Sequence, residues 1–234
     1  MSANGGLRRA RGVRIAGAMA DTMTPDEIEA MFTGPDGAFA FARWGRPIVP
    51  VVFGVEDDTL RVVKGAIEAM VAMAGHKMAE TDPELGANLM IFFLRDWDEL
   101  AQVPNLDRLL PDLDGLLGRL RGADANQYHA FRFDESGAIR AAFVFLRMDD
   151  HLAAVPAHDL ALGQAAQVML SWADGAFAAR APLARAGEHT VLNPALAALV
   201  RAAYDPALPA AAGDAAHALR LHARMQAPRE GGGG

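Results

Sequence analysis

Residues 87–94 form the longest apolar run of the chain and constrain the fold more than any other feature. The run reads Ala-Asn-Leu-Met-Ile-Phe-Phe-Leu, with Asn88 as its one polar residue. A continuous apolar segment of this length is typical of a β-strand that is buried on both faces of its sheet. We therefore expect residues 87–94 to be the central strand of a sheet that is covered by helices.

Further strands are expected on either side of this run. Residues 48–54 are rich in valine, and because Pro50 cannot donate to a ladder they fit a sheet edge or a bulged strand. Residues 127–133 and 138–146 flank a short loop that contains a glycine. This arrangement predicts a β-hairpin.

Helices are expected over most of the remaining chain. Residues 57–74 carry apolar side chains at three- and four-residue spacing, and Gly75 is expected to end this helix. The other expected helices cover residues 24–32, 96–101, 109–120, 157–179, 193–204 and 213–225. The order of the elements predicts an α+β fold, in which a small mixed sheet is covered by helices and the C-terminal part is helical.

We expect one domain, over residues 23–226, with a tail at each end. Residues 1–22 contain a basic stretch among glycine and polar residues, which predicts a flexible tail, with an export segment as the alternative. Residues 227–234 end in four glycines and are expected to be disordered. The expected location is the cytoplasm, and the alternative is export to the periplasm.

The composition excludes several classes of protein. The chain has no cysteine, which rules out disulfides, thiolate metal sites and cysteine nucleophiles. Its formal net charge of −7 argues against nucleic acid as a partner, because binding to phosphates needs an excess of Lys and Arg. No apolar run approaches the roughly 20 residues of a transmembrane helix, so we expect a soluble protein that is not membrane-integral.

The sequence lacks the motifs of common catalytic and cofactor sites. It has seven histidines, but none lies in an HExxH motif. The serines are Ser2, Ser136 and Ser171, and none lies in a GxSxG motif. Neither of the glycine-rich phosphate-binding motifs occurs. We therefore assign no catalytic residue, no metal ligand and no cofactor.

Residues 43–47 are the most specific short segment of the chain. The segment reads Arg-Trp-Gly-Arg-Pro, so Trp44 stands between the cations Arg43 and Arg46. An aromatic ring between two cations can hold an anion or a carboxylate-bearing peptide, so these three are candidate binding residues. The alternative is that Trp44 packs under the sheet edge while the arginines extend outward.

Five segments in a fixed order carry a resemblance to a known family. They cover residues 41–48, 87–94, 137–142, 159–172 and 196–206. In this order they resemble an uncharacterised family of proteobacterial domains of unknown function, which is itself similar in layout to the zincin metalloproteases.

The resemblance to zincins implies a zinc site on the helix after the hairpin. There, two histidines four residues apart flank a glutamate that acts as general base. The corresponding positions here are Gly163 and Gln167 for the histidines and Gln164 for the glutamate. The resemblance therefore implies a catalytically silent domain, with Gln164 and Gln167 as candidate binding residues.

The expected function is that of a non-catalytic domain of zincin-like layout with a role in binding or assembly. One alternative is a hydrolase with a dispersed site, built from histidines and aspartates near the end of the hairpin: His129, His151, His158, Asp149 and Asp150. Another alternative is a subunit of a larger complex that packs through the alanine-rich helices of residues 157–225. The expected partner is an unidentified protein or a second copy of the chain.

Overall fold

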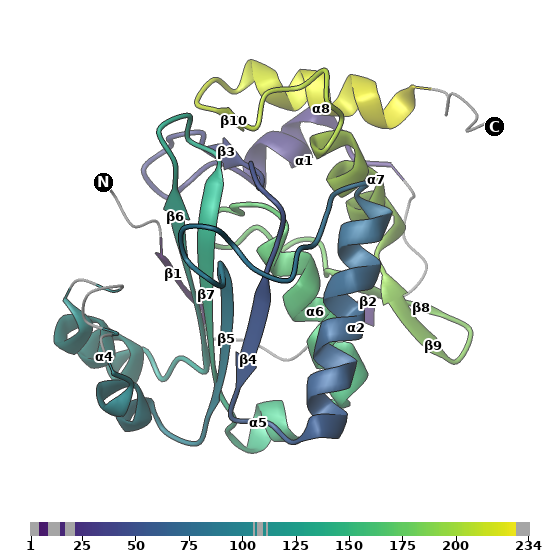
Figure 1. Cartoon of the computed structure of the whole chain (residues 1–234). Coiled ribbons are helices and arrows are strands. Elements are labelled where there is room, and N and C mark those ends of the chain that lie inside the picture. Colours follow the sequence, from purple (N-terminus) through teal and green to yellow (C-terminus); the bar gives the residue numbers. More distant parts are fainter. Residues whose placement is uncertain are drawn as a thin grey trace.

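The computed structural model describes residues 5–8, 15–16, 22–104, 106, 110 and 112–227. Within these ranges five strands form a sheet in the order β1-β6-β7-β5-β4 (Figure 1). The strands are Gly5–Arg8 (β1), Pro50–Phe53 (β4), Leu89–Leu94 (β5), Gln127–Phe133 (β6) and Ile139–Arg147 (β7). β4, β5 and β7 run parallel, whereas β6 is antiparallel to β7 and to β1. The predicted α+β class with a mixed sheet is confirmed.

The middle of the sheet is β7, not β5. The prediction that residues 87–94 are the central strand is therefore wrong, although the strand is internal and buried on both faces. Ile91 belongs to the core on one face and Phe92 to the core on the other. β7 shows the same double burial, with Val144 in one core and Phe143 in the other. Apolarity alone could not rank the two strands, because both are covered on two sides.

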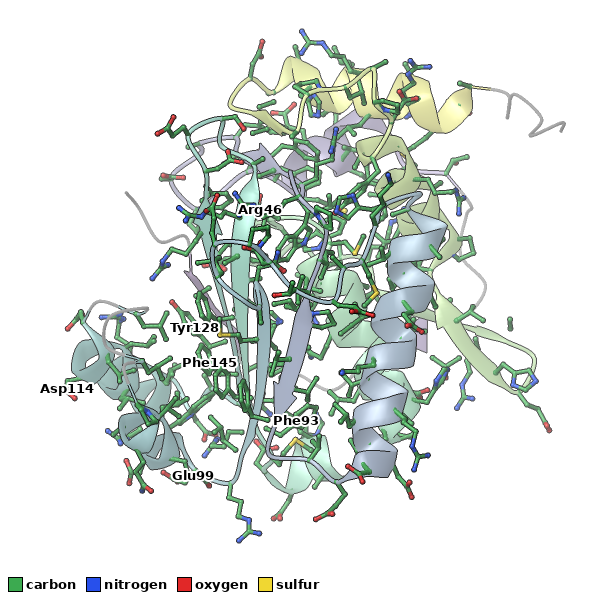
Figure 2. All side chains as sticks on the ribbon, in the orientation of Figure 1. Arg46, Phe93, Glu99, Asp114, Tyr128 and Phe145 are labelled. Carbon is green, nitrogen blue, oxygen red and sulfur yellow. The ribbon has the colours of Figure 1, made fainter. Side chains whose placement is uncertain are left out.

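Helices cover the two faces of the sheet (Figure 1). On one face lie α2 (Asp57–Met73), α6 (Ala157–Val168) and α7 (Pro194–Ala203). On the other lie the 3-10 helix η1 (Trp97–Gln102) and α4 (Leu113–Gly122). Figure 2 shows Tyr128 and Phe145 on the α4 side, where their rings stack at 6.3 Å.

The remaining elements close the ends of the molecule. Helix α8 (Ala216–Gln226) packs on α7 and on α1 (Pro25–Ala30), and the short α5 (Asp150–Ala153) follows β7. A three-stranded sheet has the order β2-β8-β9, and β3 pairs with β10. These strands are Ile15–Ala16 (β2), Phe41–Ala42 (β3), Leu183–Ala186 (β8), His189–Leu192 (β9) and Ala211–Ala212 (β10).

The predicted helices are confirmed where neighbouring residues in the sequence set their ends. Helix α2 ends as expected before Gly75, which adopts a φ of +67°. The helix predicted over residues 157–179 is wrong in length, because α6 ends at Val168. Beyond it the Ser171 amide donates to the Ala42 carbonyl, and Leu170 forms a β-bridge with Arg43. Pairing with a distant segment thus replaces the helical hydrogen bonds.

The two edges of the five-stranded sheet are protected in different ways. The edge position predicted for the Pro50 segment is confirmed. Because the Val49 carbonyl accepts from the Leu89 amide, the backbone nitrogen of Pro50 points away from β5, toward the open edge of the sheet. A proline nitrogen carries no hydrogen, so this edge lacks one of the donors that a further strand would need. The strand at the opposite edge is β1, which pairs with β6 and covers it.

The tails are described only in part. Within the tail expected over residues 1–22, β1 pairs with β6 and β2 pairs with β8, so these two segments are strands. Residues 1–4, 9–14, 17–21 and 228–234 lie outside the described residues. None of the helices in the described ranges combines the length and apolarity that crossing a membrane requires.

Replacing Trp44 with phenylalanine tests how strongly the end of α6 is anchored. The Trp44 side chain is fully buried, and its Nε1 donates to the Val168 carbonyl at 2.8 Å. We expect Trp44→Phe to lower the free energy of unfolding by about 1–3 kcal/mol, because the buried carbonyl loses its donor. The measurement is urea unfolding. Leu219→Ala, at a 59% exposed residue of α8, is the control, and equal effects of the two variants would contradict the anchoring role.

His217 in α8 predicts a pH dependence of stability. Its side chain is fully buried, neither ring nitrogen has a hydrogen-bond partner among the residues that the structure describes, and the ring lies 4.4 Å from that of Phe41. Burial lowers the pKa of His217 below its ordinary value of 6.5, and Arg220 lowers it further. Below that ordinary value the unfolded chain therefore binds a proton that the folded chain does not bind.

We therefore expect the free energy of unfolding to fall as the pH decreases from 6.5. The contribution of His217 is complete above pH 6.5 and is lost as the pH falls toward the lowered pKa of the folded protein. Urea unfolding at several pH values should show a shallower slope for His217→Leu. The exposed His151→Leu is the matched control. An unchanged slope in His217→Leu would contradict this account.

Candidate functional site

A pocket of about 350 Å³ lies where three segments distant in the sequence meet. They are residues 32–40 after α1, residues 129–131 of β6 and residues 171–174 after α6. Its lining consists of Phe32, Gly34, Pro35, Asp36, Ala38, Ala40, His129, Phe131, Ser171, Trp172, Ala173 and Asp174. The pocket combines aromatic rings, two carboxylates, a hydroxyl and an imidazole.

Backbone hydrogen bonds hold the two loop segments together. In the first loop, Gly37 adopts a φ of +77° and its amide donates to the Gly34 carbonyl, which makes a tight turn. The Asp36 carboxylate accepts from the Ala38 amide and stabilises this turn. The Ala173 amide donates to the Met31 carbonyl at 2.8 Å. The loop after α6 is thereby fixed beside the turn that follows α1.

Three buried polar side chains form a hydrogen-bond chain at the wall of the pocket. The Gln164 amide nitrogen donates to the Gln127 Oε1 at 2.7 Å, and the Gln164 Oε1 lies 2.9 Å from the His129 Nε2. An amide oxygen can only accept, so the His129 Nε2 carries a proton and donates it. In the neutral imidazole, Nδ1 is then the acceptor nitrogen, and it is buried. We call Gln127, Gln164 and His129 the buried hydrogen-bond chain.

The charge of the pocket is negative. Asp36 and Asp174 are exposed at its wall, and the described lining contains neither lysine nor arginine. Neither carboxylate has an ion-pair partner among the described residues. The Trp172 ring stacks on Phe32 with centroids 5.3 Å apart. A positive ligand would be attracted both by the carboxylates and by the aromatic faces.

The structure places Arg43, Trp44 and Arg46 away from the pocket lining. The Arg43 guanidinium donates to the Leu208 carbonyl and lies 5.5 Å from the centre of the Tyr204 ring. Arg46 forms ion pairs with Asp82 and Glu84, each at 3.4 Å. Trp44 is the buried anchor described above. Each side chain has internal partners, and the binding role expected for the three stays a prediction.

The positions that correspond to zincin ligands do not fit a zinc ion. Gly163 has no side chain, Gln164 is part of the buried hydrogen-bond chain, and the Gln167 amide nitrogen lies 3.3 Å from the Gly163 carbonyl. These residues supply neither imidazole nor carboxylate, so we derive no metal chemistry from them. Over the described ranges, no three His, Cys, Asp or Glu residues are grouped as a metal site would require. Gln164 contacts a pocket residue, His129.

The structure groups the candidate residues of a hydrolase differently from the sequence-based expectation. Asp149 caps α5 through the Leu152 amide and accepts from Asn126, while His151 and His158 are exposed. None of these three lines the pocket.

The pocket instead brings His129 together with Asp36, Ser171 and Asp174. Sequence reasoning missed these three residues because Ser171 and Asp174 fall within the helix predicted over residues 157–179 and Asp36 falls between two glycines that indicate a turn. The signal that could have found the site is the pair Gln127 and His129, two polar residues on one face of a buried strand.

Replacing Gln164 with leucine tests the buried hydrogen-bond chain. The change leaves the His129 Nε2 and the Gln127 Oε1 without this partner in a buried position, so we expect a loss of about 1–3 kcal/mol in the free energy of unfolding. The half-buried Gln167→Leu on the same helix is the matched control, with an expected loss below about 1 kcal/mol. Guanidinium unfolding measures both variants. Equal losses would contradict the role of the chain.

Comparison with known proteins gives no match to a family model, to a curated protein or to a solved structure. The resemblance to a proteobacterial family and to the zincins therefore stays a prediction.

Proposed function

We propose that this domain is a non-catalytic binding protein whose pocket takes a small organic cation, such as a protonated amine. The observation that carries the proposal is the composition of the pocket. Asp36 and Asp174 supply negative charge, Phe131 and Trp172 supply aromatic surface, and the described lining contains no lysine or arginine to oppose a cation.

Each part of such a ligand has a complementary group in the pocket. An ammonium group is attracted by the two carboxylates and by the aromatic faces. Its N–H groups are donors, and the carboxylates of Asp36 and Asp174 can accept from them. An apolar part of the ligand can pack on Phe131. An anion of the same size would instead be repelled by Asp36 and Asp174.

A hydrolase that uses Ser171 and His129 is the second candidate, because the structure brings both residues to one pocket. A serine nucleophile needs a base within hydrogen-bond reach. In this chain Gln164, not a carboxylate, accepts from the His129 Nε2, and Nδ1, the ring nitrogen that would have to act as the base, is buried. This arrangement favours binding over catalysis.

Assembly through the C-terminal helices has less support than ligand binding. The large apolar side chains classed as exposed in the described part of the chain are Phe53, Leu85 and Leu219. Of these, Leu219 alone lies on a helix of residues 157–225. A single exposed leucine does not make the contiguous apolar patch that marks an obligate interface.

A titration with three matched probes tests the proposed ligand class. The probes are n-butylammonium, n-butanol and butyrate, which share the alkyl chain and differ in charge. We expect n-butylammonium to shift the indole N–H resonance of Trp172 in a saturable manner, because its charge is complementary to the pocket. The two other probes should leave this resonance in place up to the same concentration. Saturable binding of butyrate alone would contradict the proposal.

Replacing Asp174 with asparagine tests the electrostatic part of binding. We expect Asp174→Asn to weaken n-butylammonium binding by about three- to fivefold, the range for one exposed charge pair. Asp114→Asn is the matched control, because Asp114 is an exposed carboxylate of α4, beyond the opposite face of the sheet (Figure 2). Equal losses in both variants would show that net charge, not the pocket, attracts the probe.

An esterase assay separates binding from hydrolysis. We expect p-nitrophenyl butyrate to be hydrolysed at the same slow rate by the unmodified chain and by Ser171→Ala, since the His129 Nε2 donates to Gln164 and the remaining ring nitrogen, Nδ1, is buried. A large loss of rate in Ser171→Ala would favour the hydrolase and contradict the non-catalytic proposal.

A further inference from the structure

The register of β1 on β6 places a glycine directly opposite His129. Gly6 pairs with His129 and Gly5 pairs with Ala130. In an antiparallel ladder, directly paired residues project their side chains from the same face of the sheet. Position 6 therefore belongs to the pocket face. Position 5 belongs to the opposite face, where Ala130 lies in the core under α4.

The edge of β6 is a place where a different strand can pair beside the pocket. β1 is four residues long and contains two glycines, which weaken a strand because they lose more backbone freedom on ordering and contribute no side chain. At the other edge of the sheet, Pro50 removes an outward-facing donor. An incoming strand can thus displace β1 from β6 more easily than it could displace a long, well-packed edge strand.

We propose that the ligand of the pocket is a lysine or arginine side chain carried by an extended peptide, which replaces β1 on β6. The inference rests on the proposed cation-binding function and names the class of ligand. The residue paired with His129 sends its cationic side chain across the pocket face. There the aliphatic stem packs near Phe131 and the charged end reaches the carboxylates Asp36 and Asp174.

This mode of binding divides affinity and specificity between two parts of the ligand. Backbone hydrogen bonds to β6 bind any extended peptide, and the pocket selects the side chain at one position. The native Gly6 places no side chain at the position opposite His129. The chain thus carries its own edge strand, and the position opposite His129 is free for the side chain of an incoming peptide.

Two lysine substitutions within β1 of the full-length chain test the register. In Gly6→Lys the new side chain should enter the pocket and weaken n-butylammonium binding at least tenfold. In Gly5→Lys it projects from the opposite face, so the affinity should stay within twofold of the unmodified chain. Both variants add the same charge one residue apart. Equal affinities in the two variants would overturn the proposed register.

A peptide in trans tests binding without a change in the chain. The probe is a fluorescent peptide of residues 3–10, either with the native sequence or with Gly6→Lys. By fluorescence anisotropy on the full-length chain, the lysine peptide should bind at least tenfold more tightly than the native peptide. With the Asp174→Asn chain, the ratio of the two affinities should fall. An equal affinity of both peptides, or an unchanged ratio in Asp174→Asn, would overturn the inference.

Different experimental outcomes would contradict the cation-binding function and the peptide inference. If n-butylammonium binds at Trp172 but the lysine peptide has no advantage, the pocket takes a free amine and the peptide inference is wrong. If n-butylammonium does not bind, the cation-binding function itself is wrong, and the inference falls with it.

Discussion

The candidate site depends on the hydrogen bonds of Gln164 more than on any other polar contact. Gln164 lies on α6, whereas Gln127 and His129 lie on β6, so its two hydrogen bonds join the helix to the sheet across the core. In such a setting each polar group needs its partner, because an unsatisfied one is costly. The same two bonds set the proton on Nε2 of His129. A structural contact between helix and sheet thereby fixes the orientation and the tautomer of the imidazole at the wall of the pocket.

Several described arginines form ion pairs within the chain, whereas Asp36 and Asp174 of the pocket have no ion-pair partner among the described residues. Arg46 pairs with Asp82 and Glu84, and Arg180 pairs with Glu27 at 3.0 Å. Burial opposes ionisation of Asp82, but amide donors from Leu85 and Glu84, together with Asn88 and Arg46, lower the pKa of this carboxyl. These paired arginines and carboxylates stabilise the fold, and each charge is balanced by its partner and attracts a ligand only weakly. The charges of Asp36 and Asp174 are not balanced by an ion pair among the described residues, so they can attract a cation, and we therefore favour the pocket as the binding site.

The sequence predicted the elements whose signals are local and missed the features that depend on distant contacts. The apolar stripe of α2 and the turn between β6 and β7 are encoded by neighbouring residues, and both are confirmed. The end of α6 is set by pairing of Leu170 with Arg43, which no local signal indicates. The same holds for the pocket. Asp36, His129 and Ser171 meet only because the chain folds three segments together.

The measurement that tests the central claim most directly is the detection of intermolecular NOEs from bound n-butylammonium. The account predicts NOEs from the methylene protons of the probe to the ring protons of both Phe131 and Trp172, two residues that line the pocket from different segments. Saturable binding with NOEs to other residues, and none to these two rings, would contradict the assignment of the pocket as the binding site.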